Sequence, residues 1–289
     1  GLFDETHEKS YMFRHNLFRD YFCACHLYWH WPGKHDMLPS SVISFPMETA
    51  FVLGAGLMSD DCISELVGTL VDRDMLSLAL DCLDNSALAS TARGHEMEER
   101  ILARIDELYK VSYGMAGRER AGMCITRSLL KRGEKGLHRL LWVIDRQLHN
   151  RNRNVVLFAN LNMYPGKVLK CVEDRLIRLL EIQEEDGSPY AIQYIMQALK
   201  RAGAVRYNDV FVRMGVKHPH LVIESELRPD PSDLSEEQML ALCGLLTRGS
   251  GDRILKMNIK AHLPDYLEAG MKPDYRRLRE TLKGYRKRQ

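Results

Sequence analysis

The stretch SPYAIQYIMQALKRAG, residues 188–203, decides the fold. Ser188 is a favoured helix N-cap, Pro189 suits the first helical position, and Gly203 suits the position just after a last helical turn. Between them, apolar residues recur every three or four positions, as they do along one face of a helix. The stretch therefore predicts an amphipathic helix over residues 189–202.

The same pattern extends over most of the chain and predicts an all-α protein. Leu, Ala, Met, Glu, Lys and Arg are plentiful, whereas runs rich in Val, Ile and Thr are scarce, a balance that favours helix over sheet. VVLF at 155–158 and HLVIESEL at 220–227 have strand propensity, but we interpret both as helical because neither alternates with a period of two. The other predicted helices cover residues 15–30, 46–58, 61–71, 74–83, 95–111, 118–131, 135–149, 155–163, 167–182, 236–247 and 274–288.

Consecutive helices joined by short turns are typical of an α-solenoid or a helical bundle. Each predicted pair spans about 30–40 residues, the length of a HEAT or TPR repeat. The chain contains no TPR or ankyrin consensus, so the predicted repeat is one of architecture. We expect Asp74 in the first turn of its helix, where a carboxylate suits the helix dipole.

Composition places the chain among ordinary globular proteins. Hydrophobic residues make up 45% and charged residues 28%. No run of 18 apolar residues predicts a membrane span, and the first residues do not form a signal peptide. The seven cysteines are scattered and odd in number, which favours free, mostly buried thiols in a reducing compartment, the cytoplasm. The chain lacks an initiator Met, and we expect it to begin partway through a longer protein.

Motifs for catalysis and phosphate binding are missing from the sequence. No GxxxxGK[ST] loop occurs, and GAGLMSD at 54–60 and RGSGDR at 248–253 are better interpreted as helix ends. GHEMEER at 94–100 has Glu99 where a zinc protease needs its second His, so its glutamates are expected in the first turn of a helix. We therefore predict no enzyme activity and no cofactor for this chain.

The segment near the N-terminus holds several residues of the types that bind metal ions. The donors suited to zinc are Cys23, Cys25, His26, His30 and His35. They lie among five aromatic residues, which favours a packed helix, and we predict no metal site there.

One segment, FRHNLFRDYFCA at 13–24, resembles the signature at the end of the winged-helix domain in NACHT and NLR-type STAND ATPases. The matching residues are Phe13, His15, Phe18, Asp20, Tyr21, Phe22 and Ala24. Phe18, Phe22 and Cys25 follow at i, i+4 and i+7, which predicts one buried helical face. Residues 47–83 resemble the first solenoid helices that follow in such proteins.

The resemblance implies an organisation in three parts: a winged-helix end at 1–45, an α-solenoid at 46–270 and a basic C-terminal helix at 271–289. It implies a parent ATPase that binds ATP and ADP upstream, in which His15 reaches the β-phosphate of ADP; the simpler alternative is a His packed at a helix start. The solenoid would then sense a protein or peptide ligand and hold the inactive state. A stand-alone TPR or HEAT-like scaffold is the alternative.

The C-terminal segment is the one strongly basic part of the chain. Residues 272–289 hold eight Lys or Arg and two acids. A nucleic-acid site is a further alternative here, with Tyr275 and Tyr285 placed for stacking. Its candidate contacts are Arg276, Arg277, Arg279, Lys283, Arg286, Lys287 and Arg288. Leu278, Leu282 and Tyr285 also form an apolar stripe, which predicts instead that the helix docks on the last repeat and that its charges cap the solenoid.

Overall fold

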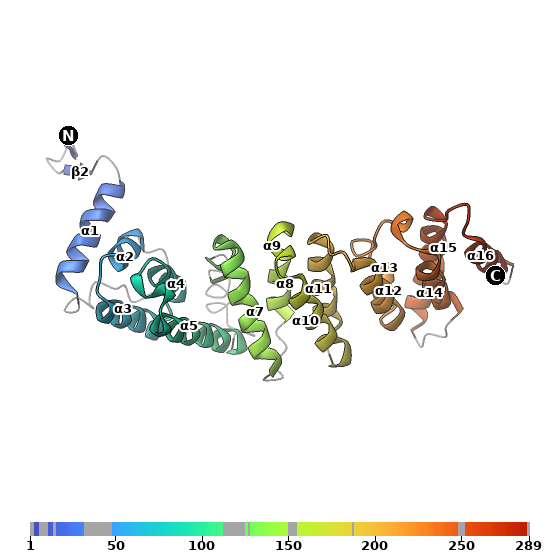
Figure 1. Ribbon diagram of the computed structural model, residues 1–289, viewed down its shortest axis with the longest axis horizontal. Helices are drawn as coiled ribbons and strands as arrows, with labels where there is room; N and C mark the ends of the chain where they lie inside the picture. The colour runs from blue at the N-terminus through green and yellow to red at the C-terminus, as the bar shows by residue number, and fades with distance from the viewer. Residues whose placement is uncertain are drawn as a thin grey trace. The chain divides into compact units, whose positions relative to one another are not determined.

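The computed structural model describes residues 3–5, 11–13, 16–31, 48–111, 125–126, 128–149, 155–186, 188–247 and 252–287. It consists of two compact units, Gly1–Asn154 and Val155–Gln289 (Figure 1). The predicted all-α class is confirmed. The strands within the described ranges are β1 (Phe3–Glu5) and β2 (Tyr11–Phe13), a short antiparallel hairpin in which Phe3 pairs with Phe13. The sequence pattern did not predict this hairpin.

The first unit is a succession of helices in which each packs mainly on its near neighbours along the chain. Its elements after the hairpin are α1 (Asn16–His30), α2 (Glu48–Ala55), α3 (Asp60–Asp72), α4 (Leu76–Asp84), the 3-10 turn η2 (Ala87–Ser90), α5 (Ala92–Val111) and α7 (Gly133–His149). The main contacts join α1 to α2, α3 to α4, α2 to α4, α4 to α5 and α5 to α7. The helix predicted at 118–131 lies mostly outside the described residues.

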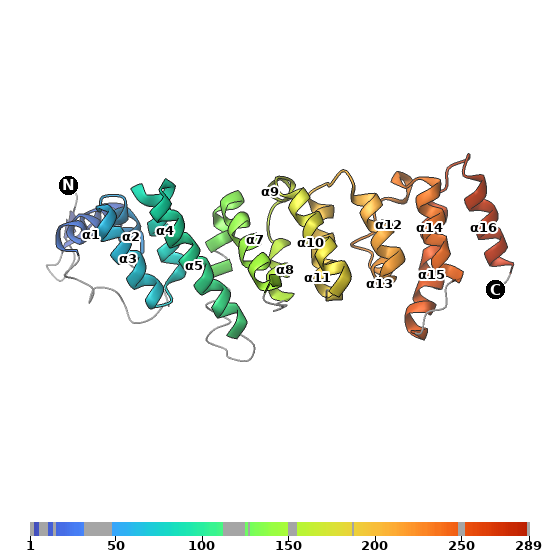
Figure 2. The same ribbon diagram turned by 60° about the horizontal axis from the view of Figure 1, so that its bottom comes forward.

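The second unit follows the same rule. It contains α8 (Val155–Leu161), α9 (Gly166–Lys170), α10 (Glu173–Asp186), α11 (Pro189–Arg201), α12 (Tyr207–Lys217), α13 (His220–Ile223), η3 (Pro231–Asp233), α14 (Glu236–Thr247), α15 (Arg253–Ala269) and α16 (Arg276–Arg286). One row of contacts runs through α8, α11, α12, α14 and α16, and α13 packs on α15. Figure 2 shows α16 at the outer edge of this unit, beyond α14 and α15.

The signals at helix ends explain why several elements form where predicted. Helix α11 starts at Pro189 and is followed by Gly203 with φ +61°, a left-handed conformation that glycine adopts without strain. Ser235 and Gln238 form a capping box at α14: the Gln238 amide donates to Ser235 Oγ at 3.2 Å, and the Ser235 amide donates to Gln238 Oε1 at 2.8 Å.

Three predictions about element bounds are wrong. The helix predicted at 167–182 is two helices, α9 and α10, which are separated by a turn at Cys171. The segment at 220–227 forms only the four-residue α13 before it turns. Asp74 precedes α4 with φ +58°, because it ends the turn after α3 and its carboxylate pairs with Arg104 of α5.

A Pro-rich segment, residues 227–234, is held in place by buried tyrosines from three elements. The Tyr207 hydroxyl donates to Leu227 O at 2.5 Å, Tyr266 to Pro229 O at 3.0 Å and Tyr275 to Leu234 O at 2.9 Å. These bonds satisfy backbone carbonyls that no helix ladder satisfies. They tie α12, α15 and the start of α16 to one loop.

Two further findings concern the chain as a whole. Among the described residues, none of the helices combines the length and the apolar character that a membrane crossing requires. The division between the units at Asn154 falls inside the predicted solenoid. The domain bounds at 45 and 270 stay predictions.

Candidate functional site

Helix α1, which carries most of the signature segment, packs on α2 and buries a narrow face that includes Asp20, Ala24 and Leu27. Ala24 and Leu27 are fully buried, and Asp20 is 7% exposed while it accepts two hydrogen bonds from Arg19, at 2.8 and 2.9 Å. Gly54 of α2 lies against Ala24, since a Cβ at Gly54 would stand 3.5 Å from Ala24 O. The two helices therefore approach closely at a point where neither has a large side chain.

The opposite face of α1 presents large apolar side chains to solvent. They are Leu17 (66% exposed), Phe18 (42%), Tyr21 (51%), Phe22 (46%), Tyr28 (44%) and Trp29 (75%). On a helix of 3.6 residues per turn, these positions fall within one arc of roughly 140°. We call this set the aromatic face. An exposed apolar patch on a folded protein usually marks an interaction site.

The prediction that Phe18 and Phe22 lie on the buried face of the motif helix is wrong. The contact with α2 buries the face that carries Ala24 and Leu27, because Ala24 and Gly54 let the two backbones come together. Of the motif residues, Asp20 and Ala24 pack as predicted. Phe13 lies in β2, and His15 lies outside the described residues.

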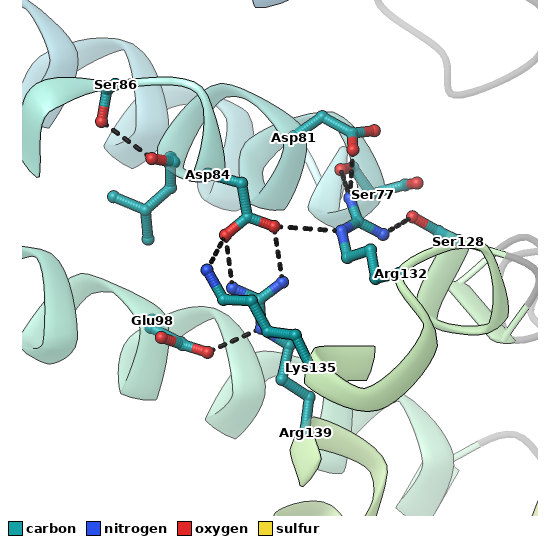
Figure 3. Close-up of polar contacts among 10 residues, drawn as sticks. Ser77, Asp81, Asp84, Ser86, Glu98, Ser128, Arg132, Lys135 and Arg139 are labelled. Atoms are coloured by element: carbon teal, nitrogen blue, oxygen red, sulfur yellow. Dashed lines mark hydrogen bonds and ion pairs between the residues drawn. The ribbon is translucent and has the colours of Figure 1, made fainter. Parts of the chain in front are cut away.

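A cluster of charged side chains joins α4, α5 and α7, and the sequence analysis did not find it (Figure 3). The Arg139 guanidinium donates to both carboxylate oxygens of Asp84, at 2.7 and 2.8 Å, and to Glu98 Oε1 at 2.6 Å. The Arg139 side chain is only 2% exposed. Arg132 and Lys135 also reach Asp84. We call this set the Arg139 clamp.

Electrostatics in the clamp favour the ionised carboxylate. Burial alone would raise the pKa of Asp84, but the hydrogen bonds from Arg139 and Lys135 outweigh it and bring that pKa to about 2. Burial raises the pKa of Asp81, and the neighbouring Arg132 offsets part of that rise. Three acids face three bases, and the Ser128 hydroxyl accepts a hydrogen bond from Arg132 beside them. The ion pairs join α4, α5 and α7 to one another.

The glutamates of GHEMEER are not at a helix start, as the sequence analysis expected. Helix α5 begins at Ala92, so these residues lie beyond its first turn. Glu98 instead faces α7 and accepts from Arg139. Arg139 lies 41 residues after Glu98, and no sequence pattern predicts a contact over that separation. The prediction for the GHEMEER glutamates was therefore wrong.

A groove of about 430 Å³ lies along α3 and α5. Its lining residues are Val71, Asp72, Arg100, Ala103, Arg104 and Glu107. Arg104 donates to both oxygens of Asp74, at 2.7 and 3.2 Å, and Arg100 donates to Asp72 at 3.0 Å. Arg104 also pairs with Glu107 at 2.8 Å, so each of the four charged residues that line the groove has an ion-pair partner.

Helix α16 docks as the apolar stripe predicted. Leu278 is fully buried, Leu282 is 2% exposed and Tyr285 is 8% exposed, and α16 packs on α14. The idea that Tyr275 and Tyr285 stack on bases is wrong, since both rings are buried by the docking. The seven basic candidates occupy this helix and its end, and Arg288 lies outside the described residues.

No cluster of three His, Cys, Asp or Glu suited to a metal ion occurs in the part of the chain that the structure describes. Six described cysteines are free. Cys82 and Cys243 are buried, whereas Cys171 is exposed, so the expectation of mostly buried thiols is only partly met.

Comparison with known proteins gives no relative for this chain: no family model, no curated protein and no solved structure matches it.

Proposed function

We propose that this chain is a non-catalytic sensor and regulatory region of a NACHT-type signalling ATPase, and that it works in the cytoplasm. The observation that carries the proposal is the aromatic face of α1. Six large apolar side chains lie exposed in and beside the segment that resembles the end of the winged-helix domain. A second domain packed on this face would bury them and explain why they are apolar.

The β1–β2 hairpin supports the winged-helix part of the proposal. It leads directly toward α1, with β2 ending at Phe13 and α1 beginning at Asn16. A β-hairpin next to a helix is the arrangement that the wing of a winged-helix domain requires. In the full-length protein, the upstream ATPase domain would bind ATP or ADP, and His15 would contact the nucleotide.

The stacking of the helices supports a solenoid of HEAT or TPR type. The carboxylate precedes the base in each ion pair that joins described residues more than 15 positions apart. In α3–α5, Asp61 pairs with Arg93 at 2.8 Å and Asp72 with Arg100 at 3.0 Å. In α10–α12, Glu184 pairs with Arg213 at 3.0 Å. These pairs span 28–32 residues, close to the length of one helical hairpin repeat.

A stand-alone repeat scaffold is the second candidate, and the same stacking supports it. A solenoid of either origin presents an extended surface suited to a protein or peptide ligand. The scaffold reading leaves the aromatic face of α1 without a role. The sensor reading gives that face an occupant, the ATPase domain of the same polypeptide, and we prefer it for this reason.

Two measurements test the proposal. The reading frame upstream of Leu2 should encode a GxxxxGK[ST] loop within about 300–400 residues; its absence would leave the scaffold as the better explanation. In the full-length protein, Tyr21→Ser with Phe22→Ser should loosen bound ADP and raise self-association, because the closed state loses a contact. The control pair, Tyr190→Ser with Ile254→Ser, removes two exposed large apolar side chains of the second unit and should change neither property.

A further inference from the structure

The basic side chains of α16 are of two kinds: those that pair with acids of the same unit, and those that form no ion pair among the described residues. Arg277 pairs with Glu237 of α14, and Arg286 pairs with Glu268 of α15 at 2.9 Å. Arg277 and Arg286 thus each form an ion pair with an acidic residue of a preceding helix, as Arg93 and Arg100 of α5 do with α3. They hold α16 to its unit and are not available to a ligand.

The other cations form a straight line along the helix. Arg276, Arg279, Lys283 and Lys287 follow at i, i+3, i+7 and i+11, which places them within about 80° of one another over a length of about 16 Å. Arg276, Lys283 and Lys287 are exposed and have no ion pair among the described residues. Arg279 is half-buried and donates to Pro273 O at 3.2 Å. We call these four residues the basic stripe; the acid beside it is Glu280.

The stripe lies away from the buried face of α16. Leu278, Leu282 and Tyr285 point to α14, on the other side of the helix. A further repeat would need an apolar surface on the outer face of α16, and the stripe puts four cations there instead. The face is therefore suited to an acidic partner and not to another apolar helix.

The chemistry of this face favours a helix over a nucleic acid. Single-stranded nucleic acids are held by exposed aromatic rings as well as by cations. Here Tyr275 and Tyr285 are each 8% exposed, and the Tyr275 hydroxyl is used on Leu234 O. Successive cations of the stripe lie about one helical turn apart, which is about 5.4 Å. Carboxylates placed once per turn along a partner helix would have the same separation. Interhelical ion pairs of this kind occur within the chain between α3 and α5, where carboxylates of α3 pair with arginines of α5.

We propose that the basic stripe of α16 docks an acidic α-helix of another protein, with carboxylates spaced at i, i+3, i+7 and i+11, the spacing of the stripe itself. Each carboxylate faces one cation of the stripe. Because three of the four cations are exposed, salt weakens the attraction, and its strength depends on several ion pairs acting together.

The test compares three probes by fluorescence anisotropy: a helical peptide with Glu at this spacing, a helical peptide of the same composition with its Glu residues spread over all faces, and a DNA duplex. The triple variant Arg276→Gln, Lys283→Gln, Lys287→Gln removes three of the four positive charges of the basic stripe. The matched control, Lys167→Gln, Arg178→Gln, Arg253→Gln, removes three exposed charges elsewhere in the same unit. Circular dichroism checks that both variants keep their helix content.

The patterned peptide should bind the native chain and the control equally, and the triple variant about tenfold more weakly or worse. It should also bind more tightly than the peptide with dispersed Glu. Equal binding of the two peptides, or an unaffected triple variant, would overturn the proposal. Tighter binding of the duplex than of the patterned peptide would also overturn it and would assign the stripe to nucleic acid. Failure here would not touch the sensor function, which concerns α1.

Discussion

At the scale of single residues, Arg139 illustrates how much a buried charge depends on its partners. Its guanidinium is 2% exposed and meets Asp84 and Glu98. Arg139→Ala would leave two partly buried carboxylates without their main cation. We expect the free energy of unfolding to fall by about 3–5 kcal/mol. Urea denaturation measures this.

The control for Arg139 is Arg277→Ala. Its pair with Glu237 has both side chains about two-thirds or more exposed, so its removal should cost about 0–1 kcal/mol. Equal losses for the two variants would show that the clamp contributes no more than a surface ion pair.

Tyr266 makes, through its hydroxyl, a buried hydrogen bond whose contribution to stability can be measured. Its hydroxyl donates to the buried carbonyl of Pro229 at 3.0 Å, and its ring lies 5.4 Å from the Arg228 guanidinium. Tyr266→Phe keeps the ring and removes only the donor, so we expect a loss of about 1–2 kcal/mol. Tyr190→Phe changes a ring that is 64% exposed and should leave the urea midpoint where it is. A silent Tyr266→Phe would mean that water replaces the donor.

At the scale of elements, the burial of α1 reverses the roles that the sequence pattern gave to its residues. Leu27 is fully buried against α2, whereas Phe22 is 46% exposed. We expect Leu27→Ala to cost about 2–5 kcal/mol in this chain and Phe22→Ala to cost less than about 1 kcal/mol. Thermal unfolding of the two variants measures which substitution causes the larger loss of stability. A larger loss for Phe22→Ala would return it to the core of the first unit.

Element positions were predictable where the signal is local. Pro189 and Gly203 bound α11, and Ser235 and Gln238 begin α14, through contacts within a few residues. No Pro or Gly marks the break after α9. The sequence pattern therefore predicted a single helix that runs through Cys171. Propensity alone does not reveal such a break.

The site was predictable to a smaller extent, because its geometry depends on long-range contacts. The apolar stripe of α16 follows from period alone, and the structure confirms it. Which face of α1 is buried depends on Gly54, a residue of another helix, and on the short side chain at Ala24. Asp84 and Arg139 are 55 residues apart, and no sequence rule pairs them.

At the scale of the whole molecule, the absence of a P-loop lysine from the sequence leads to a prediction for nucleotides. Saturating ATP with Mg²⁺ should leave the melting temperature of this chain unchanged. A ligand present at 100 times its Kd would add about 2.7 kcal/mol, which is easily measured as a shift. A clear rise would contradict the proposal that this region has no nucleotide site of its own.

The two units should respond differently to acid. In the second unit, burial lowers the pKa of His218, with further lowering by His220 and Lys217, and burial lowers the pKa of His220. Glu184 is the acid near His218, and it already pairs with Arg213. The unfolded chain therefore takes up protons on these histidines before the folded chain does, so stability falls as the pH drops below about 6.5.

The first unit has its acid-sensitive group in a lower range. The pKa of Asp84 is about 2 in the fold, against about 3.9 in an unfolded chain. Its contribution to stability is therefore complete above pH ~4 and is lost as the pH falls toward ~2. All three tryptophans, Trp29, Trp31 and Trp142, lie in the first unit. Their fluorescence reports on that unit alone, whereas circular dichroism reports on both.

Urea titrations at about pH 7 and about pH 5.5 therefore separate the two units. Acidification should lower the urea midpoint seen by circular dichroism and leave the tryptophan midpoint nearly unchanged, because His218 and His220, whose pKa values are lowered by burial, both lie in the second unit. The double variant His218→Gln with His220→Gln should abolish the shift, since it removes the groups that bind protons in the unfolded chain. Equal shifts of both midpoints in the native chain would mean that the units unfold together; a shift that persists in the double variant would place the sensitivity in other groups.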